Sequence, residues 1–214
     1  MNEQTRSRTL RMIQLAILSA IIILMAFTPL GFLRYGSLEI TFSTLPVIIG
    51  AIFIGPAGGA FLGGVFGLTS FAQAFGLNPF GAALLAINPF YLFVLTMVPR
   101  ILTGWLAGLI CRALLRTKRP SWLAYMVSSL SGALLNSVLF LGALVLLFGQ
   151  TDLLQSFGST GLAIIVALAG INVLVEVPVI TLAGTAVAKA LEKSMGKKPL
   201  PSESSDSADR TAGG

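Results

Sequence analysis

The sequence LPVIIGAIFIGPAGGAFLGGVFG, residues 45–67, contains no charged side chain and carries a turn signal, Gly55-Pro56, near its middle. Small residues recur in it at every fourth position, on one face of a helix: Gly55, Gly59, Gly63 and Gly67. A helix face without side chains lets a second helix approach to backbone contact, as helices do in lipid. We expect two short helices, 44–55 and 57–75, that form a tight hairpin and pack by this glycine face inside a bundle.

The whole chain has the composition of an integral membrane protein. Of its 214 residues, 55% are hydrophobic and only 10% are charged, and the mean hydropathy is +0.90. Soluble globular domains contain about 25% charged residues. Strands with open edges are not allowed in lipid, and no alternation of apolar and polar residues indicates a barrel. The sequence therefore predicts an all-α integral membrane protein.

A helix needs about 20 apolar residues to cross the hydrocarbon core of a bilayer. By that measure the sequence predicts a bundle of six membrane helices, at residues 11–33, 44–55, 57–75, 89–116, 121–149 and 160–193. The second and third are short and need not span the bilayer fully. The chain then divides into an N-terminal segment at 1–10, a six-helix transmembrane domain at 11–193, and a polar tail at 194–214 that we expect to be disordered.

The basic residues predict the orientation. Six spans place three clusters on one side of the membrane: Arg6, Arg8 and Arg11; Arg112, Arg116, Lys118 and Arg119; and Lys189, Lys193, Lys197 and Lys198. The three outer loops, at 34–43, 76–88 and 149–159, contain only one basic residue in total. Because cytoplasmic loops are enriched in Lys and Arg, we predict that both termini are cytoplasmic. The net charge of +6 is explained by this topology, so we do not expect nucleic-acid binding.

Several kinds of chemistry lack the residues that they need. The chain has no His and one Cys, which excludes the usual zinc sites, disulfides and Cys/His catalysis. It also lacks the G-x-x-x-x-G-K-[ST] phosphate loop, so we expect no ATPase site of its own. We expect a protein that is not an enzyme and carries no cofactor. Any uphill transport would draw its energy from a partner or an ion gradient.

Four polar side chains from the last three predicted helices fall at a similar depth in the membrane: Arg100, Asn136, Asn172 and Glu176. Polar groups at that depth normally face a cavity or each other. Two interpretations stay open: a structural network in which Arg100 and Glu176 form an ion pair, or a polar pocket that orients a small solute. Pro99 and Pro178 favour the pocket, since each bends a helix beside a polar residue.

The outer ends of the helices offer a mouth for such a pocket. Asn88-Pro89 begins the fourth predicted helix there, with Phe80, Phe90 and Tyr91 nearby. The segment RYGSLEITFST, residues 34–44, is long enough to close over the mouth. We therefore count Asn88 and Thr44 among the candidate binding residues.

Three stretches give the chain a resemblance to a known family: LAILSAI at 15–21, ITFSTLPVIIGAIFIGPAGGAFLGGVFGLTSF at 40–71 and VPRILTGWLAGLI at 98–110. With six spans and both termini inside, the chain resembles the substrate-binding S components of energy-coupling-factor (ECF) vitamin transporters, and the pantothenate type most. The fit to that type is imperfect, because Thr44 stands where a His is usual.

The resemblance implies a mechanism and partners. An S component in a bacterial cytoplasmic membrane captures a vitamin from outside, then joins a membrane coupling protein and two ATPase subunits, and tilts in the bilayer to deliver its ligand. Carried over by position, Ala16 and Ala20 would form the helix seam that meets the coupling protein. Residues 36–44 would belong to the loop that closes the pocket.

The choice of solute stays open. For pantothenate, Arg100 would bind the carboxylate, and Asn136 and Asn172 the amide and hydroxyl groups. Riboflavin or another heterocyclic vitamin would stack instead on aromatic side chains: Phe90, Tyr91 and Trp105. Other classes are a stand-alone proton-coupled carrier using Glu176, a membrane enzyme with that carboxylate as general base, and a purely structural membrane partner.

Overall fold

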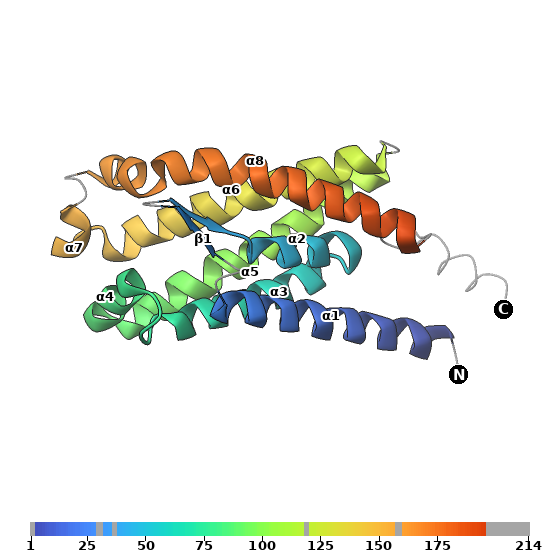
Figure 1. Cartoon of the computed structure of the whole chain (residues 1–214), viewed down its shortest axis with the longest axis horizontal. Helices are drawn as coiled ribbons and strands as arrows, with labels where there is room; N and C mark the ends of the chain where they lie inside the picture. Colours follow the sequence, from blue (N-terminus) through green and yellow to red (C-terminus); the bar gives the residue numbers. More distant parts are fainter. Residues whose placement is uncertain (1–2, 29–31, 36–37, 118–119, 157–159, 196–214) are drawn as a thin grey trace, which may run out of the picture.

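The computed structural model describes residues 3–28, 32–35, 38–117, 120–156 and 160–195, and their side chains except at 3–4, 6–7, 32–35, 38–41, 161–172 and 195. Eight helices occur in these ranges (Figure 1): α1 (Glu3–Phe27), α2 (Thr44–Phe53), α3 (Pro56–Gln73), α4 (Pro79–Ile87), α5 (Pro89–Arg116), α6 (Ser121–Phe148), α7 (Asp152–Gln155) and α8 (Gly161–Met195). Two strands, β1 (Phe32–Tyr35) and β2 (Leu38–Thr41), form an antiparallel hairpin in which Phe32 pairs with Thr41.

Four of the described helical stretches are long and apolar enough to cross a membrane: Arg8–Phe27, Pro89–Arg116, Ser121–Phe148 and Val173–Ser194. They lie in α1, α5, α6 and α8, where four of the six spans were predicted. The other two predicted spans, 44–55 and 57–75, correspond to the shorter helices α2 and α3. The chain is therefore a multi-pass helical membrane protein, and the count of six spans stays a prediction.

The three segments expected as outer loops contain regular structure. The segment 34–43 holds part of the β1–β2 hairpin, 76–88 holds α4, and 149–159 holds α7. Helix α4 starts where Asn78 Oδ1 accepts a hydrogen bond from the Gly81 amide at 3.1 Å and Pro79 occupies the first turn. An Asn cap followed by Pro is a strong helix-start signal. The structure thus adds a two-stranded hairpin and two short helices to the predicted α-helical bundle.

Helices α3 and α5 pack at backbone distance along the predicted glycine face. A side chain at Gly59, Gly63 or Gly67 would collide with a main-chain oxygen of α5, at Gly104, Arg100 and Thr96 respectively. Dispersion and close backbone contact replace the hydrophobic driving force in lipid. The expectation that this face packs inside the bundle is confirmed. Gly55 has a different role, because its φ of 99° places it at the turn between α2 and α3, a conformation that favours glycine.

One half of the bundle is filled by apolar side chains. Helix α5 packs against α3 and α6, α8 packs against α6, and α1 packs against α3. A buried cluster joins α2 to the C-terminal part of α5, the N-terminal part of α6 and the last turns of α8: Ile48, Ile52, Cys111, Tyr125, Ile180 and Ala188. Cys111 is fully buried in it. The half of the bundle near α4 is less completely filled.

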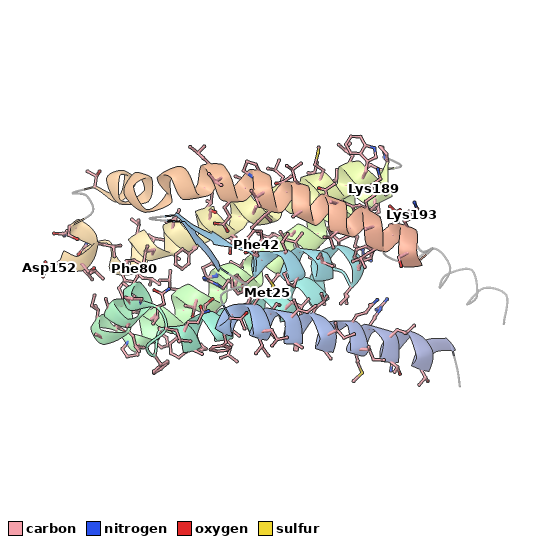
Figure 2. The ribbon with its side chains drawn as sticks, in the orientation of Figure 1. Met25, Phe42, Phe80, Asp152, Lys189 and Lys193 are labelled. Carbon is pink, nitrogen blue, oxygen red and sulfur yellow. The ribbon has the colours of Figure 1, made fainter. Side chains whose placement is uncertain are left out.

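The start of α1, the end of α5 and the end of α8 lie at the same end of the bundle (Figure 1). Figure 2 shows Lys189 and Lys193 at this end, whereas Phe80 and Asp152 lie at the opposite end. The described helix ends that carry basic residues therefore lie at one end of the bundle. Assigning that side to the cytoplasm stays a prediction from the charge pattern. The predicted tail lies outside the described residues from position 196 onward.

Candidate functional site

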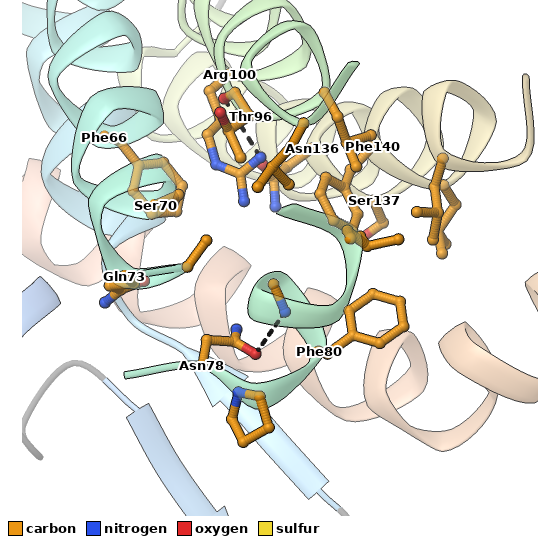
Figure 3. Close-up of a pocket in the computed structure, with 18 of the residues that line it drawn as sticks. Phe66, Ser70, Gln73, Asn78, Phe80, Thr96, Arg100, Asn136, Ser137 and Phe140 are labelled. Atoms are coloured by element: carbon orange, nitrogen blue, oxygen red, sulfur yellow. Dashed lines mark hydrogen bonds between the residues drawn. The ribbon is translucent and has the colours of Figure 1, made fainter. Parts of the chain in front are cut away.

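A cavity of about 550 Å³ opens in the half of the bundle near α4 (Figure 3). Its walls come from α3, α4, α5, α6 and α8. Most lining side chains are apolar, and a few polar groups lie among them: Ser70, Gln73, Asn78, Thr96, Arg100, Asn136, Ser137 and Glu176. Pockets for small solutes have volumes of about 300–1,000 Å³ and this mixed lining. The size and chemistry fit a small, partly polar molecule.

Arg100 on α5 is the cation of this cavity. Its side chain makes one long hydrogen bond, from Nη1 to the Thr96 carbonyl at 3.5 Å, while its buried Nε has no partner. Its guanidinium carbon lies 4.8 Å from the centroid of the Phe66 ring and 4.9 Å from that of Phe140. Aromatic rings attract a cation without occupying its N–H groups. Arg100 therefore keeps donors for a molecule in the cavity.

Asn136 on α6 supplies an unused acceptor. Its Oδ1 is buried without a hydrogen-bond partner, whereas the hydroxyl of the neighbouring Ser137 donates to the Ala133 carbonyl at 3.3 Å. A buried polar atom without a partner costs about 1–3 kcal/mol. We therefore expect a water or a solute in the cavity to donate a hydrogen bond to Asn136 Oδ1.

Glu176 on α8 lines the same cavity as Arg100. Among the described side chains, no ion pair within 4.0 Å joins Arg100 to a carboxylate. The direct ion pair of the structural-network interpretation is therefore not formed. Both residues line one cavity without a direct ion pair between them.

The other predicted binding residues lie elsewhere or cannot be placed. Asn88 caps α5, where its Oδ1 accepts hydrogen bonds from the amides of Phe90 at 3.0 Å and Tyr91 at 3.1 Å. Thr44 begins α2, is 1% exposed, and is not among the residues that line the cavity. The side chain of Asn172 lies outside the described side chains. The structure thus brings Arg100, Asn136 and Glu176 together, and leaves Asn88 and Thr44 away from them.

The sequence did not predict that α4 forms a wall of the cavity. Asn78, Phe80 and Leu84 line it from this helix. A signal was present: the tripeptide NPF occurs at 78–80 and again at 88–90, and each Asn caps the helix that follows it. Two capping signals that bracket an apolar stretch predict a short helix rather than a loop. The flanking rings of Phe66 and Phe140 had no comparable signal.

The aromatic side chains proposed for a stacked heterocycle lie away from the cavity. Phe90, Tyr91 and Trp105 are 69%, 42% and 44% exposed and are absent from its lining. Within the described ranges, no group of three or more His, Cys, Asp or Glu side chains could hold a metal ion. The lining of the cavity itself combines polar and charged groups with three other aromatic rings, Phe66, Phe80 and Phe140.

Ala16 and Ala20 lie on an exposed face of α1. The same helix contacts α3 and α2 with its other side, where Ile22 is fully buried. The two alanines therefore do not pack inside the bundle. Their face is free for lipid or for another membrane helix.

Comparisons with known proteins identify the family. Residues 10–187 match the family model described as "ECF transporter, substrate-specific component". The chain is 34% identical over 126 residues to a protein named pantothenate transporter PanT from Leuconostoc mesenteroides, an alignment that covers 56% of this chain and 60% of the relative, less than two thirds of its length.

A second relative is matched more fully. The chain is 35% identical over 160 residues to a protein named pantothenic acid transporter PanT from Lactococcus lactis, which covers 70% of this chain and 76% of the relative. The family match extends from α1 into α8 and includes every helix that lines the cavity. The chain belongs to the family of substrate-specific components of ECF transporters.

Proposed function

We propose that the chain is the substrate-binding subunit of an ECF-type ABC transporter and that it captures pantothenate from outside the cell. The observation that carries this proposal is the cavity with two complementary unpartnered groups, the Arg100 Nε donor and the Asn136 Oδ1 acceptor. The names of two relatives, both pantothenate transporters, support the choice of solute.

The chemistry of pantothenate suits these groups. Its carboxylate would bind the Arg100 guanidinium through charge-assisted hydrogen bonds, and its amide N–H or a hydroxyl would donate to Asn136 Oδ1. The two methyl groups of its pantoyl half would contact apolar wall residues, such as Leu95 and Leu141. Glu176 would accept a hydrogen bond from a ligand hydroxyl, and Asn172 would bind as well. Binding by Asn88 and Thr44 stays a prediction that their positions do not support.

Uptake would require partner subunits. We propose that the subunit spans a bacterial cytoplasmic membrane six times with both termini inside, and joins a membrane coupling protein and two ATPase subunits. The exposed face at Ala16 and Ala20 would meet the coupling protein, because small residues let two membrane helices approach closely. The chain sequence contains no phosphate loop, so ATP hydrolysis is assigned to the partners.

A ligand screen tests the proposed solute. The purified subunit in detergent is heated with pantothenate, riboflavin, thiamine, folate, biotin or pyridoxine, and its melting temperature is recorded. A solute at 100 times its dissociation constant stabilises a single-site protein by about 2.7 kcal/mol. We expect a shift with pantothenate alone. A rise in melting temperature with riboflavin alone would reassign the solute. If the folded protein shows no rise with any of the six vitamins, the proposal that it binds one of them is contradicted.

A stand-alone proton-coupled carrier is the second candidate, because Glu176 places a carboxylate on the cavity wall. The two proposals differ in their energy source. In liposomes that contain only this chain, a carrier accumulates pantothenate when a pH gradient is imposed. An ECF subunit accumulates it only when the coupling protein, both ATPases and ATP are present.

A further inference from the structure

Two phenylalanines from different helices flank the Arg100 side chain. Phe66 projects from α3 and Phe140 from α6, and both helices pack against α5, which carries Arg100. The ring centroids lie 4.8 Å and 4.9 Å from the guanidinium carbon. Figure 3 shows the Arg100 side chain with Phe66 on one side and Phe140 on the other. We call these two rings the aromatic clamp.

The aromatic clamp stabilises the Arg100 guanidinium, which has few other stabilising contacts among the described residues. Arg100 has no ion pair within 4.0 Å among the described side chains, and its one hydrogen bond is to a carbonyl of its own helix. A desolvated cation gains most from the faces of aromatic rings. The clamp therefore offsets part of the cost of burial, and it does so without using the N–H donors.

The clamp also restricts how a solute can approach. Nη1 donates to the Thr96 carbonyl and Nε is buried without a partner, so the edge that carries Nε and Nη2 keeps unused hydrogen-bonding capacity. The N–H groups of that edge are parallel and match the two oxygens of a planar carboxylate. A hydroxyl or a carboxamide presents only one acceptor to the same edge.

We propose that Phe66 and Phe140 are specificity-determining residues, which hold Arg100 so that the cavity selects solutes with a carboxylate. The inference rests on the proposed pantothenate function and deepens it. The rings act through Arg100 and do not themselves bind the carboxylate. Their effect on affinity should therefore depend on the presence of both Arg100 and the carboxylate.

The test compares two probes that differ only at this group: pantothenate, and panthenol, in which a hydroxymethyl group replaces the carboxylate. Dissociation constants are measured by calorimetry for the wild type, Phe140→Leu and Phe66→Leu, and for Phe140→Leu combined with Arg100→Met. We expect each Leu variant to lose roughly fivefold to thirtyfold in pantothenate affinity and much less for panthenol. In the Arg100→Met background, Phe140→Leu should have almost no further effect.

Two control variants separate positioning from packing. Phe140→Tyr keeps the ring and should retain pantothenate affinity within about twofold. Leu141→Ala changes the neighbouring wall residue and should weaken both probes alike. Because the two rings lie on different helices and are replaced in separate variants, the test can still be made if one of these variants misfolds.

The outcomes are distinct. Equal losses for both probes, or a Phe140→Leu effect that persists without Arg100, would overturn the clamp while the pantothenate function stands. A wild type that binds no pantothenate would overturn both the proposed solute and the clamp that rests on it.

Discussion

Replacing Arg100 by Met should separate the stability of the empty protein from its affinity for pantothenate. In the empty cavity the guanidinium has one hydrogen bond of 3.5 Å, an unpartnered Nε and no close ion pair among the described side chains. Removing a buried, poorly paired charge in favour of an apolar side chain of similar length is often neutral or stabilising. We therefore expect the melting temperature of the ligand-free protein to stay the same or to rise.

The affinity should fall steeply, because the ligand would lose two charge-assisted hydrogen bonds. Each contributes about 1.5–3 kcal/mol, so the two together give a loss of at least about 3 kcal/mol. This corresponds to a dissociation constant raised by roughly 10² to 10³. Arg100→Lys should recover only part of the loss, since an ammonium group cannot form the bidentate contact.

Titration calorimetry with pantothenate and thermal unfolding in the same detergent provide the two measurements. Because Arg100→Met leaves Glu176 without a cation in the cavity, the double variant with Glu176→Gln serves as the folding control. An Arg100→Met protein that binds pantothenate within about threefold of the wild type would refute the assignment of Arg100 to the carboxylate. A ligand-free protein that no longer folds, even with Glu176→Gln, would show that the guanidinium is structural.

Three further variants test other parts of the site and its setting. Asn136→Leu should weaken pantothenate binding by roughly fivefold to thirtyfold through loss of its free acceptor, while Ser137→Ala, whose hydroxyl already bonds Ala133, should change it little. Gly63→Ala should destabilise the subunit by about 1–3 kcal/mol, because the new methyl group meets the Arg100 carbonyl, and thermal unfolding measures this. Ala20→Trp should leave vitamin binding intact and abolish uptake by the reconstituted transporter.

Controls for these variants lie close to them in the chain. At Gly64 an added methyl group meets only the Ile101 side chain, at 3.8 Å, so Gly64→Ala should be neutral or stabilising in thermal unfolding. Ile21→Trp places the same side chain at another exposed position of α1 and should preserve uptake. Equal effects of Gly63→Ala and Gly64→Ala would contradict the close-packing interpretation, and equal effects of the two Trp substitutions would contradict the docking face.

The sequence predicted much of the bundle and about half of the site. The longer helices, the turn at Gly55 and a glycine face that packs inside the bundle followed from composition and spacing, whereas the partner of that face, α5, did not. Arg100, Asn136 and Glu176 were selected as polar groups at one depth, and all three line the cavity. Asn88 was chosen for its place near the expected mouth, but a residue before Pro at a helix start is also a capping position, and that is where its side chain is used.

The sequence alone determined that this chain is a helical membrane protein, since lipid requires backbone hydrogen bonds to be satisfied within each segment and apolar length is a local property. Only the tertiary structure decided that Arg100 and Glu176 line the same cavity, that Phe66 and Phe140 flank the cation, and that α4 walls the cavity. These contacts join helices far apart in the sequence. They depend on how each helix is rotated about its axis and which rotamers its neighbours leave free, and hydrophobic periodicity specifies neither.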